Sequence, residues 1–559
     1  MIEEIFTKKN LIYTFKAFLS LTLAFFIVMS LGLDKPMWAM IVALFLALRP
    51  EAGFIIEKGI LAILVNSTGI VVAFIIISFF LPYPVLAITS LFIFIAITMY
   101  FSANMSHPNF VYGLTLANLT CTIMVLYAIA NPLATTEQSI FHTGFSRISE
   151  IIIGCLSAFF VNYYIFPVKV KDTLKNHVER SFNLTIDYAK LIFSIDHLDD
   201  DPKYNKQVEN IINSLILLDN DLTANKYENI NSNNYYNFSD KVIKLIQTAH
   251  LIRKHIVKNK SNNLIKTKLE KISTELESCC SNNTKISLTS NNILVRNLVN
   301  KFNSMIESYN QINSTKILES SNKTYFQFKN YNNNIVGSIN IFRTIFLLLF
   351  LSLLWLNTQT SSSSLILMIV APSAFSQLLL PTLNTDQVIK KMITGMIISV
   401  PISIFIVLNL LAQVVGYFEL FMLVLIVTLF LPVITLTIPR FQPYSLGFIV
   451  GWICMIQPSN HMNFNIPHLL SSGLSAFFGC FILWLAFKVC PQGPYAITRK
   501  LAVKSIIKDR KKLRNREISK NQYNAYIVKK ILCIYKNRKN DISSERDIDF
   551  ALKSLTKSI

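Results

Sequence analysis

Residues 31–53 read LGLDKPMWAMIVALFLALRPEAG, and charged residues flank an apolar run from Met37 to Leu48. A helix of about a dozen residues is roughly 18 Å long at 1.5 Å per residue. The hydrocarbon core of a bilayer is about 30 Å thick. The run is therefore short for a membrane span, although several neighbouring apolar segments are long enough to cross.

The composition is that of a polytopic membrane protein. Hydrophobic residues make up 52% of the 559 residues and charged residues only 15%, against about a quarter charged in soluble domains. The formal net charge of +21 lies outside the apolar segments, and 495–559 has 18 Lys and Arg against 6 Asp and Glu, so 18 − 6 = +12. Basic flanks are typical of the positive-inside rule and of anionic lipid contact. We therefore expect the lipid bilayer, and no nucleic acid, as a partner.

The eight cysteines form no CxxC motif, and about half lie within apolar segments. Buried thiols behave as small hydrophobic groups. We expect no disulfide framework, no metal site and no cofactor.

The apolar segments form two clusters of six. They are predicted at 11–33, 37–48, 60–81, 84–103, 110–130 and 145–166, and at 340–357, 365–376, 391–412, 419–438, 444–457 and 468–489. Between the clusters, amphipathic periodicity predicts a soluble helical bundle. The predicted fold is an all-α polytopic membrane protein with two repeated six-span halves flanking a cytoplasmic helical bundle, plus a basic cytoplasmic C-terminal tail. The four predicted domains are 1–167, 168–334, 335–494 and 495–559.

Short matches at near-constant offsets indicate that the two clusters are copies. Phe15-Lys16 corresponds to Phe342-Arg343, Gly154-Cys155 to Gly479-Cys480, and Phe166-Pro167 to Cys490-Pro491. Such repeats are common in transporters, with the substrate site at their interface. Basic residues concentrate in loops on one side if each half crosses six times, which predicts cytoplasmic termini and a cytoplasmic middle domain.

The short second span has a counterpart in the second cluster, LILMIVAPSAFSQ, which contains Pro372. Proline interrupts a helix, and paired short or interrupted segments point to a transport site. The alternative is a plain tilted helix, extended at its ends by snorkelling Lys35 and Arg49.

The order of motifs in the first cluster resembles a known family. The residues are Phe15-Lys16, Leu33-Asp34-Lys35-Pro36-Met37-Trp38-Ala39-Met40, Pro50, Gly53, Glu57-Lys58-Gly59, Asn66-Ser67-Thr68-Gly69, Asn109-Phe110-Val111-Tyr112-Gly113-Leu114 and Arg147-Ile148-Ser149-Glu150. They resemble the start of fusaric acid resistance and aromatic acid exporter proteins; the second cluster matches by architecture only. The resemblance implies a bacterial inner-membrane efflux carrier, similar to p-hydroxybenzoic acid efflux pumps that act with a periplasmic adaptor protein. Arg49, before Pro50, departs from the family pattern.

Charged residues within spans are costly and are functional candidates. Arg147 and Glu150 stand three residues apart on one helix face. Arg147 is a candidate ligand for a substrate carboxylate, and Glu150 a candidate proton carrier. Alternatively, the two charges only neutralise each other. Ser472 and Ser475 occupy the corresponding places in the second cluster, which favours a functional role for the pair.

Other candidates are weaker. Lys16 and Arg343 are expected either to mark the cytoplasmic interface or to line an entrance for an anion. Further substrate-binding candidates are Arg49, Lys58, Tyr112 and Asn118, and Glu51 is a second proton-coupling candidate.

The expected function is export of small, often aromatic, carboxylic acids by a secondary transporter rather than by an enzyme. Proton coupling is expected because no GxxxxGK[ST] motif for ATP binding occurs. An anion channel, suggested by distantly similar plant malate channels, is one alternative. A membrane-embedded transferase is another. A homo-oligomer is also compatible with the sequence.

Overall fold

The computed structural model describes residues 5–47, 52–105, 108–193, 201–222, 232–258, 293–313, 328, 331, 334–357, 363–380, 385–411, 417–459, 465–491, 495–538 and 542–556. Within these ranges the regular elements are helices, and no strand occurs. The chain forms two compact units. The first comprises 1–168 and 332–493, and the second 169–331 and 494–559.

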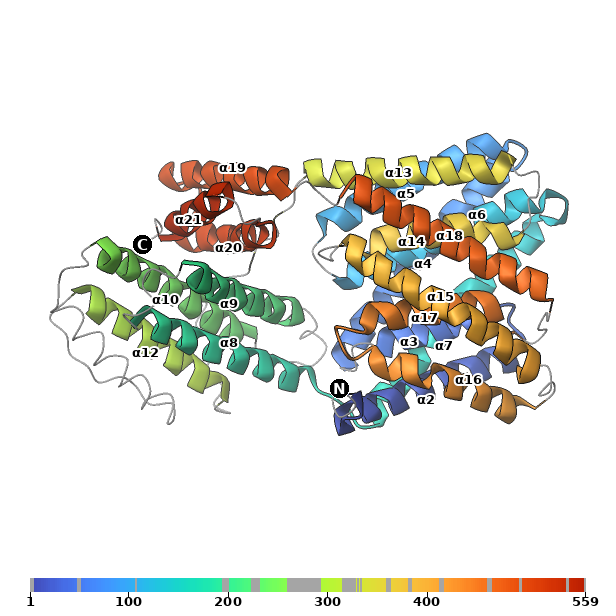
Figure 1. Ribbon diagram of the computed structural model, residues 1–559, viewed down its shortest axis with the longest axis horizontal. Helices are drawn as coiled ribbons and strands as arrows, with labels where there is room; N and C mark the ends of the chain where they lie inside the picture. Colours follow the sequence, from blue (N-terminus) through green and yellow to red (C-terminus); the bar gives the residue numbers. More distant parts are fainter. Residues whose placement is uncertain are drawn as a thin grey trace. The chain divides into compact units, whose positions relative to one another are not determined.

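The first unit contains the apolar helices (Figure 1). In chain order they are α2 (Lys8–Ser30), α3 (Met37–Ala47), α4 (Ala52–Phe80), α5 (Pro84–Asn104), α6 (Pro108–Ala130), α7 (Glu137–Tyr164), α13 (Asn334–Asn357), α14 (Leu367–Leu378), α15 (Thr385–Asn409), α16 (Phe418–Thr435), α17 (Gln442–Ile456) and α18 (Ile466–Val489). Short 3-10 turns, η1 (Pro132–Ala134) and η4 (Ser363–Ile366), precede α7 and α14. Among the described residues, nine helices are long and apolar enough to cross a membrane, and α3, α14 and α17 are shorter. The prediction of a multi-pass helical membrane protein is confirmed.

The same helix pairings occur twice in this unit. α2 and α3 pack against α7, and α4 packs against α6; likewise α13 and α14 pack against α18, and α15 against α17. Two further contacts are reciprocal, because α5 packs against α13 and α16 against α2.

Glycines allow the short helices to approach the last long helix of each set. A Cβ atom added at Gly154 of α7 would lie 2.7 Å from the carbonyl oxygen of Ala39 in α3. One added at Gly479 of α18 would lie 2.3 Å from the carbonyl oxygen of Met368 in α14. Pro372 stands four residues after Met368 and has no N–H to donate to that carbonyl. Only a residue without a side chain allows α18 to pack so closely there.

Contacts along α7 give the direction of α3. The backbone N–H of Lys35 donates to Oε1 of Glu150 at 2.9 Å. Four residues further along each of these two segments, Ala39 faces Gly154. α3 therefore runs parallel to α7.

α4 runs the opposite way. A Cβ atom at Gly59 would lie 3.6 Å from Cys155, whereas one at Gly144 would lie 2.9 Å from Ile70. The chain therefore reverses direction between α3 and α4, so α3 and α4 run antiparallel past the same stretch of α7.

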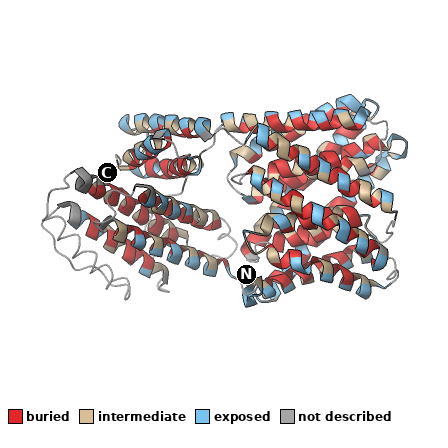
Figure 2. Cartoon of the chain, in the orientation of Figure 1, coloured by how far each residue is buried: buried red, intermediate tan, exposed pale blue. Residues whose placement is uncertain are grey.

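The second unit is a bundle of amphipathic helices. They are α8 (Val170–Phe193), α9 (Asp201–Asp221), α10 (Ser232–Lys258), α12 (Ile293–Asn313), α19 (Tyr495–Arg514), α20 (Lys520–Lys536) and α21 (Ile542–Thr556). Their apolar stripes face inward, and buried residues alternate with exposed ones along each helix (Figure 2).

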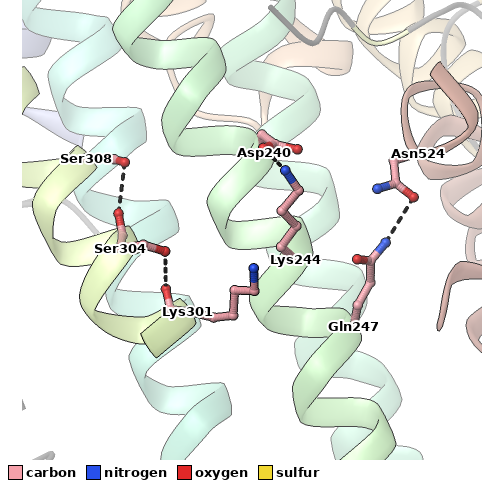
Figure 3. A network of polar contacts seen from close by, with 7 residues as sticks. All are labelled: Asp240, Lys244, Gln247, Lys301, Ser304, Ser308 and Asn524. Atoms are coloured by element: carbon pink, nitrogen blue, oxygen red, sulfur yellow. Dashed lines mark hydrogen bonds and ion pairs between the residues drawn. The ribbon is translucent and has the colours of Figure 1, made fainter. Parts of the chain in front are cut away.

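The C-terminal helices belong to this bundle rather than extending from it. Nε2 of Gln247 in α10 donates to Oδ1 of Asn524 in α20 at 3.0 Å (Figure 3). Lys529 Nζ lies 3.1 Å from Oδ2 of Asp219 in α9. Burial raises the pKa of the Cys533 thiol of α20 to about 11.

A buried polar cluster joins α8, α9 and α10. The hydroxyl groups of Tyr188 and Tyr204 are 2.6 Å apart, and the Tyr204 hydroxyl lies 3.1 Å from Nδ1 of His250. The guanidinium carbon of Arg253 lies 3.8 Å from the centroid of the Tyr204 ring. Burial raises the pKa of Tyr188 well above its usual value. These contacts tie α8, α9 and α10 together.

Candidate functional site

The first unit encloses a cavity of about 310 Å³. Its walls come from helices of both clusters: α3, α6 and α7 on one side, and η4, α14, α17 and α18 on the other. Most of the lining is aliphatic or aromatic. The polar or charged lining residues are Lys35, Trp38, Tyr112, Thr115, Tyr127, Arg147, Gln457, His468 and Ser472.

One end of the cavity is cationic. The guanidinium carbon of Arg147 lies 4.2 Å from the centroid of the Trp38 ring, and Lys35 Nζ lies 5.4 Å from that of Tyr127. Cations stacked on aromatic faces are held in place without losing their charge. The two side chains therefore present positive charge to an otherwise largely apolar chamber.

Glu150 lies behind this end and does not line the cavity. It is 1% exposed, and its Oε2 lies 3.7 Å from Nη1 of Arg147. That separation is too long for a hydrogen bond, and Oε2 has no hydrogen-bond partner among the described residues. The pair is therefore loose, and no described residue is found to accept a hydrogen bond from Arg147. The guanidinium keeps donors for an anion.

The other end is aromatic. The rings of Phe45 and Tyr112 stack with centroids 6.3 Å apart, and Lys58 Nζ lies 4.2 Å from the centroid of the Tyr112 ring. The same Nζ donates to the Phe45 carbonyl at 2.8 Å. Lys58 thus fixes the wall from outside the cavity. Trp38 and Phe45 are seven residues apart on α3, so the ends are separated by about 10 Å along that helix.

Asn118 lies outside the cavity, in a buried polar bridge. Its Nδ2 donates to Oε1 of Gln377 at 2.9 Å and to the Ser373 carbonyl at 3.3 Å. Nε2 of Gln377 donates in turn to Oγ of Ser102 at 2.6 Å. The bridge ties α6 and α5 to α14, so this amide is occupied by protein partners.

Lys16 and Arg343 also lie away from the cavity. Lys16 Nζ donates to the Phe166 carbonyl at 3.2 Å, and Nη1 of Arg343 donates to the Cys490 carbonyl at 3.2 Å. Each cation therefore binds the residue that precedes a proline just after the last helix of its own cluster. The guanidinium carbon of Arg343 also lies 3.6 Å from the centroid of the Phe487 ring.

Arg49 and Glu51 lie outside the described residues. Of the other predicted residues, the structure brings Arg147 and Tyr112 into one cavity, with Glu150 and Lys58 directly behind its walls. In the part of the chain that the structure describes, no group of three or more His, Cys, Asp and Glu side chains is placed to hold a metal ion.

Sequence reasoning missed several lining residues. Lys35 and Trp38 stand in the motif LDKPMWAM, but the sequence predicts Lys35 only as a snorkelling residue at the end of the short span. Tyr127 and His468 carried no signal, because a lone aromatic or histidine near a span end is common at interfaces. The repeat marks Ser472 only as the counterpart of Arg147, and the structure places it on the same cavity.

A family model described as the fusaric acid resistance protein family matches residues 10–555. No curated protein matches the chain significantly. The family match covers both units.

Proposed function

The chain belongs to the fusaric acid resistance protein family, and from this premise we propose that it is a secondary carrier exporting small, chiefly aromatic, carboxylic acids. The membership and the apolar helices make it a multi-pass membrane protein related to efflux. We propose in addition the class of substrate, the ion that drives transport and the direction of transport.

The observation that carries the proposal is the cavity with its cationic end. Ligand pockets are concave, mostly apolar and carry a few placed polar groups, and a volume of about 310 Å³ is at the small end of their range. Arg147 can bind a carboxylate bidentately. The walls formed by Phe45 and Tyr112 suit an aromatic or other apolar body.

The repeated helix pairings support two six-span halves that move relative to one another around the cavity. Residues of both clusters line it, including the short helices α3 and α14. Substrate sites between repeats, built partly from short or broken helices, are a common arrangement in transporters. α14 contains Pro372, and α3 has only 11 residues.

We assign proton coupling to Glu150. It is the buried carboxylate next to the cationic end, and the charged groups that interact with it are Arg147, Lys35 and Asp34. Asp34 in turn lies 3.4 Å from Nδ1 of His142. When a substrate carboxylate engages Arg147, Glu150 loses part of its counter-charge, so proton occupancy and substrate occupancy influence each other.

The positive-inside pattern supports placing both termini and the second unit in the cytoplasm, with the first unit in the bacterial inner membrane. A periplasmic adaptor and a homo-oligomer complete the proposed assembly. A reporter fused after Val168, and another after Ile559, should both be cytoplasmic. A periplasmic Val168 reporter would show that one of the short helices does not cross.

The test of function is transport by the purified chain in proteoliposomes with an imposed pH gradient, using labelled benzoate derivatives. Accumulation above the electrochemical equilibrium of the substrate supports a carrier. Flux that only relaxes towards that equilibrium would indicate a channel, and no flux of any carboxylate would contradict the proposal. A toxicity screen of a deletion strain across weak aromatic acids identifies substrates to try first.

A further inference from the structure

Helix α19 has one face packed and one face open. Its inner face packs on α20 and α21 through Ala502 and Ile506, which are fully buried. Arg499, also buried, donates from Nε to Oδ2 of Asp547 at 2.6 Å. The remaining face is exposed along its length (Figure 2).

The open face carries a row of cations. Its exposed members are Lys500, Lys504, Lys508, Lys511 and Arg514. Steps of four, four, three and three residues keep them on one side of the helix. The row is defined here as the α19 stripe.

Among the described residues, no acidic side chain forms an ion pair with the α19 stripe. The single acidic residue of the helix, Asp509, is buried and forms an ion pair with Lys530. None of the five stripe residues forms an ion pair with another described residue. Like charges at i,i+4 destabilise a helix, so an anionic partner would relieve a repulsion that the fold leaves in place.

The stripe is also partly apolar. Ile497 and Ile507 are 43% and 44% exposed and stand three residues before Lys500 and three after Lys504. Long basic side chains beside exposed aliphatic ones are favoured at membrane interfaces, because their stems cover apolar surface while the charged ends stay in water.

Lipid suits this face better than nucleic acid does. Residues 496–514 contain no aromatic side chain, whereas single-stranded nucleic acid is bound by stacking bases on aromatic rings. In the sequence, only five residues separate Val489, where the last apolar helix ends, from Tyr495, where α19 begins. Basic clusters immediately after a membrane span are typical of binding to anionic headgroups.

From these observations we infer that the α19 stripe binds the phosphate groups of anionic phospholipids in the bilayer that holds the first unit. The lysines and arginine supply the charge contact, and Ile497 and Ile507 supply shallow apolar contact. The inference is independent of the proposed substrate and of proton coupling.

The test measures the acylation rate of each lysine by mass spectrometry, using the whole chain in nanodiscs of phosphatidylcholine alone or with about 30% phosphatidylglycerol. Lys500, Lys504, Lys508 and Lys511 should react at least about threefold more slowly in the anionic discs. Exposed Lys206 of α9 should be unchanged. The protection should disappear in about 0.5 M salt, because screening shortens electrostatic attraction to a few ångströms.

A matched pair of double variants separates the stripe from net charge. Lys504→Glu with Lys508→Glu should abolish the protection of Lys500 and Lys511. Lys175→Glu with Lys206→Glu makes the same change in net charge on exposed positions outside the stripe, and it should leave the protection intact.

Equal reaction rates in the two discs would overturn the inference. If the equal rates are also low relative to that of Lys206, they indicate that protein covers the stripe. Protection by an added polynucleotide or by an acidic peptide, without an effect of lipid, would also overturn the inference and assign the face to that partner. The comparison of discs uses the unaltered chain, so it holds even if a variant fails to fold.

Discussion

Helices α7 and α18 occupy equivalent places in the two sets of helix pairings, yet only α7 carries charged residues well inside its length; the lysine of α18, Lys488, stands in the last turn. Both pack a glycine against a short helix, and both place a residue of the same register, Arg147 or Ser472, on the cavity. In α18 the hydroxyl of Ser472 donates to the His468 carbonyl at 2.8 Å. A serine that bonds to its own helix therefore fits at this place in α18, so packing here does not require a buried charge.

The features that both helices share, such as the close glycine contacts, serve packing. The residues found only in α7, Arg147 and Glu150, are candidates for a role in transport. A buried charge pair costs desolvation that good packing does not require. α18 fills the same structural place without Arg147 and Glu150. The following predictions test this division, beginning with the largest expected effect.

Replacing Glu150 with Gln should abolish uphill transport while leaving exchange of substrate largely intact. Glutamine keeps the size of the side chain and can still accept from the Lys35 N–H, but it carries no titratable proton. Uphill transport and counterflow are measured in parallel in proteoliposomes. Full proton-driven accumulation by the variant would remove Glu150 from the coupling mechanism.

Replacing Arg147 with Ala should weaken substrate binding by roughly 10- to 100-fold. Hydrogen bonds to charged groups contribute about 1.5–3 kcal/mol, and 1.4 kcal/mol is about tenfold in affinity. Ser472→Ala is the matched control on α18 and should change affinity less than about twofold. Affinity is measured by equilibrium binding in detergent.

The double variant Arg147→Ala with Glu150→Ala distinguishes mechanism from structure. If the pair only neutralises itself, the single changes reduce protein abundance by leaving one charge unpaired, and the double change restores both abundance and transport. We expect restored abundance without transport. A fully active double variant would contradict the roles assigned to both residues.

Gly154→Ala and Gly479→Ala should each lower stability, by about 1–3 kcal/mol, because overpacking a tight contact forces the helices apart. The loss should be larger at Gly479, where the added Cβ would lie 2.3 Å from a carbonyl oxygen, than at Gly154, where it would lie 2.7 Å away. Gly337→Ala is the control, with its nearest neighbour at 3.5 Å. Thermal unfolding in detergent gives the comparison. A destabilised control with unaffected Gly154 and Gly479 variants would refute the packing equivalence.

Lys16→Met and Arg343→Met should have the smallest effect on transport. Each cation binds a backbone carbonyl beyond the last helix of its cluster, so its loss leaves one acceptor without that donor and lowers stability by about 1–3 kcal/mol. The KM for substrate should stay within about twofold of the unaltered protein when activity is normalised to abundance. A rise in KM like that of Arg147→Ala would restore these cations to the transport path.

Much of the fold was accessible from the sequence, since each of the twelve predicted spans corresponds to one apolar helix. Boundaries differed most at the third and sixth spans, predicted from residues 60 and 145, whereas α4 begins at Ala52 and α7 at Glu137. In α4 the charged Glu57 and Lys58 lie inside the helix. Lys58 is held there by the Phe45 carbonyl and the Tyr112 ring, a compensation that hydropathy does not register. The candidate site was accessible only in part: Arg147 and Glu150 stood out as charges in an apolar span, whereas Trp38 and Tyr127 did not.

By itself the sequence determined that this chain is a helical, multi-pass membrane protein of the fusaric acid resistance family, because transfer into lipid depends mainly on the length and polarity of each segment. It also determined that Arg147 and Glu150 share a helix face, because three residues are nearly one helical turn. Only the tertiary structure decided which polar groups face open space. Lys16, Arg343 and Asn118 bind protein partners, whereas Arg147 and Lys35 face the cavity, because the surroundings of each helix face depend on segments more than a hundred residues away.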